Sequence, residues 1–170
     1  MPASRLPPAV GWNMSGFVLN LASISAGLSH VVAQAQASEL ELPATEWPGP
    51  IEATLEVDRS RDLVSIQARL RAVIRLECVR CLKGYDAPLE AEFRVVADRA
   101  GTARGLEADL ERDDYMMFHE GRQLDLREEA RESLLLALPI APHCQESCQG
   151  LCPRCGADLN DGPCGCAESR

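Results

Sequence analysis

The chain has 170 residues, of which 46% are hydrophobic and 25% charged, the balance of one soluble globular domain with a small appendage. This composition excludes a wholly disordered, collagen-like or multi-span membrane protein. Its seven aromatic residues count against a nucleic-acid module built on stacked rings. A net charge of -9 repels nucleic acid overall, so that only a local basic patch could bind it.

The N-terminal region carries weak signals. Residues 1–13 contain three prolines and fit no predicted element, so we expect a disordered extension or a true start at Met14. Residues 17–37 predict a first strand or a loose helix, and they imitate a secretory signal only thinly, because polar residues interrupt the apolar run. We therefore expect a cytoplasmic protein without membrane attachment, whose reduced thiols hold metal more often than they form disulfides.

Apolar and polar residues alternate along the middle of the chain. The alternation runs from Ile51 to Val57, from Val64 to Leu76 and again from Leu89 to Ala97. Such a period of two predicts half-buried antiparallel strands. We expect a long hairpin that is capped by the pair Cys78 and Cys81.

A helix is predicted after this sheet. Residues 98–114 are rich in charge and glycine and predict a mobile acidic loop, followed by a short strand pair at 115–118 and 122–124. Asp125 and Glu128 have the spacing of a capping box at the head of a helix over 126–138.

The predicted fold class is therefore α+β, with an antiparallel β-sheet, a long hairpin and one packed helix. We expect this domain to cover residues 14–142, followed by a cysteine-rich tail with a zinc knuckle over residues 143–170.

The tail holds six of the eight cysteines and too few apolar residues for a core, so it needs a metal to fold. The run Cys-Pro-Arg-Cys-Gly at 152–156 is typical of a zinc knuckle, because two thiolates three residues apart grip one ion and the glycine lets the backbone turn. The turn at 161–163 could return two more thiols to it. One zinc site is therefore predicted at Cys152, Cys155, Cys164 and Cys166.

Four cysteines remain, the number that a second zinc ion requires. The second, less strongly indicated site consists of Cys78, Cys81, Cys144 and Cys148, with His143 as a substitute ligand. The competing interpretations are disulfides or idle thiols in the tail, and buried thiols or a redox pair at Cys78 and Cys81. A redox pair usually opens a helix, whereas this pair ends a predicted strand.

Three stretches carry a family resemblance. They are Leu-Glu-Cys-Val-Arg-Cys-Leu at 76–82, Arg-Glu-Ser-Leu-Leu-Leu-Ala-Leu-Pro at 131–139, and the cysteine pattern of 148–166. With them the chain resembles the YceD family of bacterial and plastid proteins. The resemblance implies a role in synthesis, processing or stability of large-subunit ribosomal RNA, hence in ribosome biogenesis, without an established catalytic activity. It makes that RNA or a pre-ribosomal particle the expected partner.

A basic patch is the sequence's own indication of RNA binding. Residues 59–94 carry eight basic and five acidic side chains, a balance of +3, while the remainder carries -12. The candidate phosphate contacts are Arg69, Arg71, Arg75, Arg80 and Lys83. The alternative is a solvated strand face whose arginines pair across the hairpin with Glu77, Glu90 and Glu92.

Two further functions remain open. The first is an acidic adaptor that holds a basic protein, such as a ribosomal protein, without touching RNA. The second is catalysis, which we do not expect. His30, His119 and His143 are scattered, and zinc closed by four thiolates leaves no position for a water or a small-molecule substrate. A redox role for Cys78 and Cys81 is the remaining catalytic option.

Overall fold

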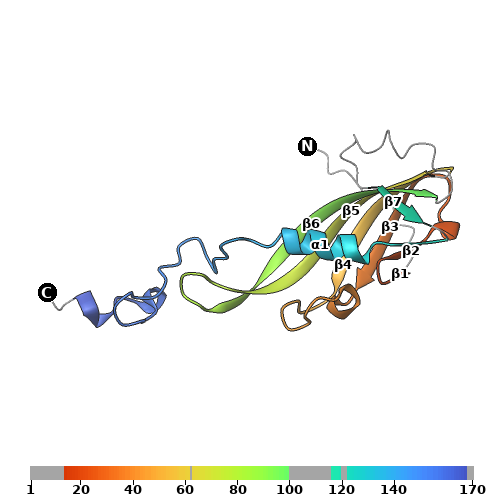
Figure 1. The fold of residues 1–170 in the computed structure, drawn as a ribbon. Coiled ribbons are helices and arrows are strands. Elements are labelled where there is room, and N and C mark those ends of the chain that lie inside the picture. The colour runs from red at the N-terminus through yellow and green to blue at the C-terminus, as the bar shows by residue number, and fades with distance from the viewer. Residues whose placement is uncertain (1–13, 62, 100–115, 120–121, 168–170) are drawn as a thin grey trace, which may run out of the picture.

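The computed structural model describes residues 14–61, 63–99, 116–119 and 122–167. The molecule is elongated, with a sheet at one end and the cysteine-rich tail at the other (Figure 1). The strands of the described residues are β1 (Met14–Ser15), β2 (Val18–Asn20), β3 (Gly27–Ala35), β4 (Ile51–Ser60), β5 (Leu63–Glu77), β6 (Gly84–Arg99), β7 (Met116–His119) and β8 (Gln123–Asp125). The helices are α1 (Arg127–Leu136) and the short 3₁₀ segments η1 (Leu21–Ser23), η2 (Ala37–Leu40), η3 (Leu159–Asp161) and η4 (Gly165–Ala167).

The strands form a mostly antiparallel sheet in the order β1-β3-β4-β5-β6-β7, and β2 pairs with β8 beside it. With α1 packed against it, this arrangement confirms the predicted antiparallel sheet and single helix. The predicted pairing of 115–118 with 122–124 is wrong. Instead, β7 runs parallel to β6 and pairs with its last four residues, Val96 to Arg99, whose backbone groups would otherwise lie on a free edge.

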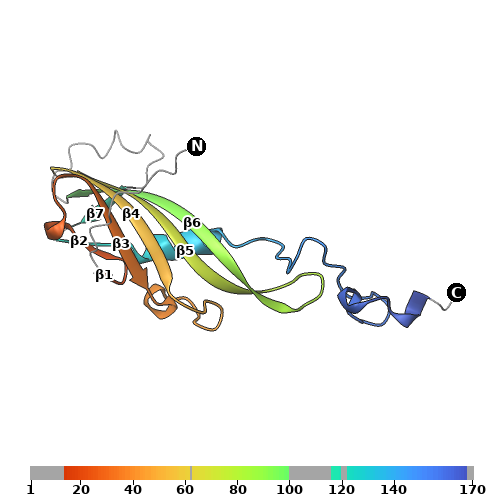
Figure 2. The same cartoon turned by 180° about the vertical axis from the view of Figure 1, so that it is seen from behind.

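The alternating pattern divides the sheet into two unlike faces. Ile66, Leu70 and Ile74 of β5 are buried, as are the apolar residues of β4, and they pack under α1 and the β2–β8 pair. Of the predicted inward set on β5, Leu76 alone is only partly buried. No described helix or strand covers the opposite face, which we call the bare face (Figure 2).

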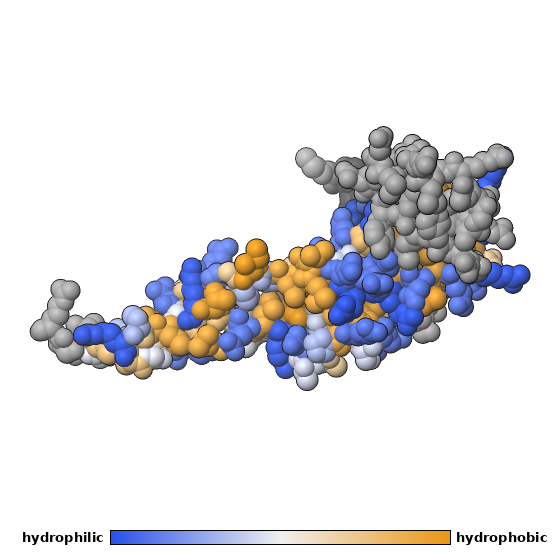
Figure 3. Space-filling view, viewed as in Figure 1, coloured by the Kyte–Doolittle hydropathy of each residue, from blue (hydrophilic) through white to orange (hydrophobic). Residues whose placement is uncertain are grey.

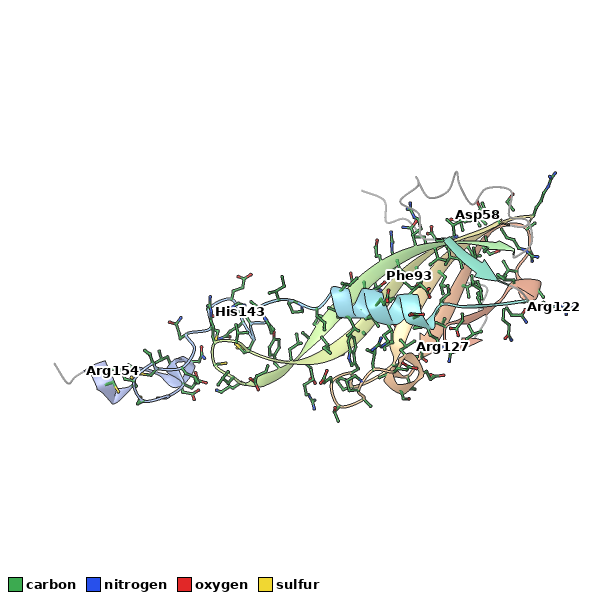
Figure 4. The ribbon with its side chains drawn as sticks, in the orientation of Figure 1. Asp58, Phe93, Arg122, Arg127, His143 and Arg154 are labelled. Carbon is green, nitrogen blue, oxygen red and sulfur yellow. The ribbon has the colours of Figure 1, made fainter. Side chains whose placement is uncertain are left out.

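Helix α1 begins one residue later than predicted. Leu126 is the N-cap residue and makes no side-chain cap, so the predicted capping box between Asp125 and Glu128 is wrong. Asp125 accepts a hydrogen bond from the first helical amide, that of Arg127, and pairs with the guanidinium of the same residue. Ala130 and Leu134 are fully buried, and Phe93 of β6 packs against the same core (Figure 4). None of the described helices is long and apolar enough to cross a membrane.

The region 17–37 forms strands, one of the two predicted alternatives. Asn20 ends β2 and caps η1 by accepting a hydrogen bond from the amide of Ala22. Of the predicted acidic loop at 98–114, residues 98 and 99 belong to β6 and the rest lie outside the described residues, as do residues 1–13.

Strands β5 and β6 extend beyond the sheet as a two-stranded arm. Their pairing runs from Leu63 opposite Asp98 to Glu77 opposite Gly84. Strand β4, in contrast, pairs with β5 only as far as Arg71. Past that point the carbonyl of Glu46 accepts a hydrogen bond from the amide of Arg75 at 2.7 Å. The arm, residues 72–89, therefore carries Cys78 and Cys81 to its tip, beside the tail (Figure 1).

Candidate metal centres

The eight cysteines gather into two sets of four. The arm cluster joins Cys78 and Cys81 at the tip of the arm with Cys144 and Cys148 from the segment after α1. The tail cluster consists of Cys152, Cys155, Cys164 and Cys166. Within each set all four sulfur atoms lie within 4.8 Å of one another. The structure thus brings together both predicted sets, while metal binding by them stays a prediction.

The sulfur spacing fits a shared ion. The Sγ atoms of Cys78 and Cys148 are 3.8 Å apart, and those of Cys81 and Cys144 are 3.7 Å apart. A disulfide requires about 2.05 Å, and no disulfide joins the described cysteines. Tetrahedral zinc with bonds of about 2.3 Å places its sulfurs roughly 3.8 Å apart. In the tail cluster, Cys152 and Cys164 are 3.3 Å apart, again too far for a covalent bond.

The two clusters are built on the same backbone turn. The amide of Cys78 donates to the carbonyl of Lys83 at 3.0 Å, and the amide of Leu82 donates back to Cys78 at 2.9 Å. The tail has the equivalent two bonds. The amide of Cys152 donates to the carbonyl of Ala157 at 2.7 Å, and the amide of Gly156 donates to the carbonyl of Cys152 at 2.8 Å. Leu82 and Gly156 both have positive φ, 59° and 73°. A leucine rarely adopts this conformation, so the sequence did not predict the positive φ at Leu82.

An arginine supports each turn from the same position. Arg80 donates from Nη1 to the carbonyl of Cys148 at 3.0 Å, and Arg154 donates from Nη1 to the carbonyl of Cys166 at 3.1 Å. Each arginine therefore ties the first cysteine pair of its cluster to the last cysteine of the same cluster. The shared run Cys-x-Arg-Cys, at 78–81 and 152–155, is the sequence signal for this repeat.

Backbone amides favour one thiolate in each cluster. The amide of Cys144, with those of Cys81 and Arg80, lowers the pKa of Cys78 to about 6 against the effect of burial. The amides of Arg154 and Cys155 lower the pKa of Cys152 to about 6. Burial and the neighbouring thiols raise the pKa of Cys144 to about 12. Further thiolates in so small a volume need a cation between them, which is the property of a metal site.

The tail is attached to the arm by specific contacts. Lys83 Nζ lies 2.6 Å from Oδ2 of Asp158, and Asn160 Nδ2 donates to Sγ of Cys148 at 3.6 Å. The backbone passes closely at Gly150, where φ is 72° and an added Cβ would lie 3.0 Å from the carbonyl oxygen of Arg80. Only glycine fits at this position without a shift of the chain.

The predicted RNA-binding residues are all engaged within the chain. Arg69, Arg71 and Arg75 form cross-strand ion pairs at 3.2, 3.1 and 2.9 Å; their partners are Glu92, Glu90 and Asp86. The register explains the partners, because Arg75 lies opposite Asp86 whereas Glu77 lies opposite Gly84. Arg80 and Lys83 make the contacts described above. The arrangement favours the alternative of a paired strand face, and RNA binding by these residues stays a prediction.

His143 does not take part in either cluster. It is exposed at the start of the tail, and the described sulfur clusters consist of cysteines alone (Figure 4). The interpretation of His143 as a substitute ligand is therefore wrong. The ligand atoms of each cluster are four sulfur atoms, and no imidazole lies among them.

Comparison with known proteins agrees with this cysteine framework. Residues 66–170 match the family described as "Large ribosomal RNA subunit accumulation protein YceD". The chain belongs to the YceD family. The match contains all eight cysteines, the arm, the helix and the tail, and it confirms the resemblance seen in the sequence.

The relatives are distant. The chain is 23% identical to the chloroplastic "Large ribosomal RNA subunit accumulation protein YCED homolog 1" of Arabidopsis thaliana, over 88% of this chain and 54% of that protein. It is 25% identical to the Zea mays protein of the same name, over 65% of this chain and 46% of that protein. It is 28% identical to the uncharacterized protein ML1660 of Mycobacterium leprae, over 71% of this chain and 54% of that protein. The chain thus spans about half the length of these relatives, and no solved structure matches it.

The contact between Lys83 and Asp158 gives the first prediction. Replacing Asp158 by Ala removes the acceptor for Lys83 and for the amides of Asn160, so hydrogen exchange in residues 150–160 should become several-fold faster. Asp161→Ala is the matched control, because the Asp161 carboxylate lies 3.8 Å from Lys83 Nζ and is 76% exposed, against 2.6 Å and 11% for Asp158. Equal exchange in both variants would show that this ion pair does not hold the tail.

Proposed function

We propose that the protein is a non-enzymatic cytoplasmic factor for the accumulation of large-subunit ribosomal RNA, and that it acts in ribosome biogenesis through a sheet braced by two zinc ions. Membership of the YceD family carries this proposal, since plant relatives bear that role in their names. The match covers the arm and the tail, so we assign the role to this part of the chain.

Zinc is the ion that best suits the two clusters. Closed sites of four cysteines are typical of structural zinc, which binds soft thiolates in tetrahedral geometry. Zinc with four thiolates carries a double negative charge, and nearby cations offset it. Arg80 and Lys83 are placed to do so at the arm cluster, and Arg154 at the tail cluster. A closed site offers no position to a water or a substrate, which supports a structural rather than a catalytic role.

Metal content provides a direct test. Protein purified without chelators should contain about two zinc ions per chain, and Cys78→Ser and Cys152→Ser should each remove about one, because each variant opens one cluster. Elemental analysis measures the ratio, and Ser147→Ala serves as a control outside the clusters. Less than one zinc per chain, or disulfides in protein taken directly from cells, would disprove the zinc sites.

The cellular role is tested by depletion. Removing the protein should lower large-subunit ribosomal RNA relative to the small-subunit RNA, measured by gel quantification. The wild-type gene and Ser147→Ala should restore the ratio, whereas Cys152→Ser should not, because an open tail cluster leaves the tail without its brace. A ratio unchanged by depletion would remove the proposed role.

The surface favours a protein adaptor as a second candidate function. All five predicted phosphate contacts already bind groups of this chain, and the hollow on the bare face places Glu52 and Glu56 beside Arg69 and Arg71. Apolar side chains are exposed where α1 meets the arm, with Leu136 at 85% (Figure 3). Exposed apolar groups of this kind suit a protein partner, such as a basic ribosomal protein, better than RNA.

RNA binding across a salt series separates the two modes. Direct contact through the arginine row predicts affinity that falls steeply with salt and is further reduced in the double variant Arg71→Ala and Arg75→Ala. From the ion pairs and the charge of -9, we expect weak binding that the double variant leaves unchanged. A marked loss in that variant would contradict the adaptor role and establish the RNA surface.

A further inference from the structure

A pocket of about 430 Å³ lies between η2 and the first turns of α1. Arg127, which lines it, is at the end of α1 that points away from the cysteine-rich tail (Figure 4). Five carboxylates and two guanidinium groups line this pocket. Its volume falls in the range of about 300–1,000 Å³ that is usual for ligand pockets.

Some of these charges are already used. Arg127 Nε lies 2.9 and 3.0 Å from the two carboxylate oxygens of Asp125, so this pair is neutral. Glu39 accepts a hydrogen bond from the amide of Gln36 at 2.7 Å. Within the described part of the chain, no ion pair engages the remaining carboxylates, which belong to Glu41, Glu128 and Glu129. The pocket therefore has an unbalanced negative charge.

Glu129 is the most unusual of these groups. It is only 9% exposed, and its Oε2 has no hydrogen-bond partner among the described residues. Burial, with the charges of Glu128 and Asp125, raises its pKa. A buried carboxylate oxygen without a partner is costly to the folded state, so its persistence in a pocket points to a partner that is not part of this chain.

Arg131 adds a donor to the same pocket. Its Nε atom is also buried without an acceptor among the described residues. A ligand that satisfies both groups must bring a donor for Glu129 and an acceptor for Arg131. A metal ion supplies no acceptor. A polypeptide with a basic side chain supplies a cation and, close to it, a backbone carbonyl.

We propose that this pocket binds an arginine or lysine side chain of a basic protein partner, with Glu129 accepting the cation and Arg131 donating to the partner's backbone. The pocket is thus the recognition site of the adaptor role, and this inference rests on that second candidate function. The size of the pocket, its negative charge and its two unsatisfied groups select the same ligand.

The test titrates the full-length zinc-loaded protein with the blocked tripeptide acetyl-Gly-Arg-Gly-amide and follows backbone amide signals by NMR. Saturable shifts are expected in residues 39–41 and 125–131. Glu129→Gln keeps the shape but removes the charge, so it should weaken binding by about tenfold or more. Glu56→Gln makes the same charge change on the opposite face of the sheet and should leave binding unchanged. Equal binding in the two variants, or shifts scattered over the acidic surface, would overturn the proposal.

A stability measurement distinguishes binding from a purely structural role. Because Glu129 is buried without a partner, Glu129→Gln should keep or raise the Tm of the free protein, and a clear fall would overturn the proposal. Arg131→Met provides a second variant that should also weaken peptide binding. Saturable Mg²⁺ binding at these residues that excludes the peptide would likewise overturn it. Ribosomal RNA levels after depletion are measured separately, so failure of the pocket and failure of the cellular role are distinguishable.

Discussion

The gathering of eight thiols into two closed clusters is the constraint on which the outer half of the molecule depends. Beyond the helix, Cys148 and Cys152 are the only apolar side chains that the described residues bury. Hydrophobic packing therefore cannot order the tail, and the remaining contacts are a few hydrogen bonds and one close ion pair. In the proposed zinc sites, thiolates held around an ion would supply the free energy that the missing core does not.

The arm is long because its tip supplies half of the arm cluster. The arm cluster takes two ligands from a strand tip and two from the segment after α1, so β5 and β6 must extend past β4 to meet that segment. The tail cluster repeats the turn and its supporting arginine without any sheet. Leu82 takes the place of Gly156 and adopts a conformation that costs a leucine roughly 1–2 kcal/mol, which the arm cluster must outweigh.

The charged groups divide the molecule into regions with different properties. On the bare face, each arginine of the row lies beside a carboxylate, and such exposed pairs contribute little to stability while they cancel the local field. At the far end of α1, carboxylates outnumber cations around a pocket, and three of them take part in no ion pair of the described residues. Rigidity at the tail and unbalanced charge at the pocket suit a protein that holds a basic partner on a fixed scaffold.

The sequence by itself determined the features that depend on near neighbours. A period of two identified the buried faces of β4, β5 and β6, and cysteine spacing separated the eight thiols into two sets. Only the tertiary structure decided which distant groups meet. The register placed Asp86 rather than Glu77 opposite Arg75, β7 and β8 found partners on different sheets, and the fold isolated Glu129 in a pocket. These outcomes depend on contacts between residues far apart in the chain, which no local pattern records.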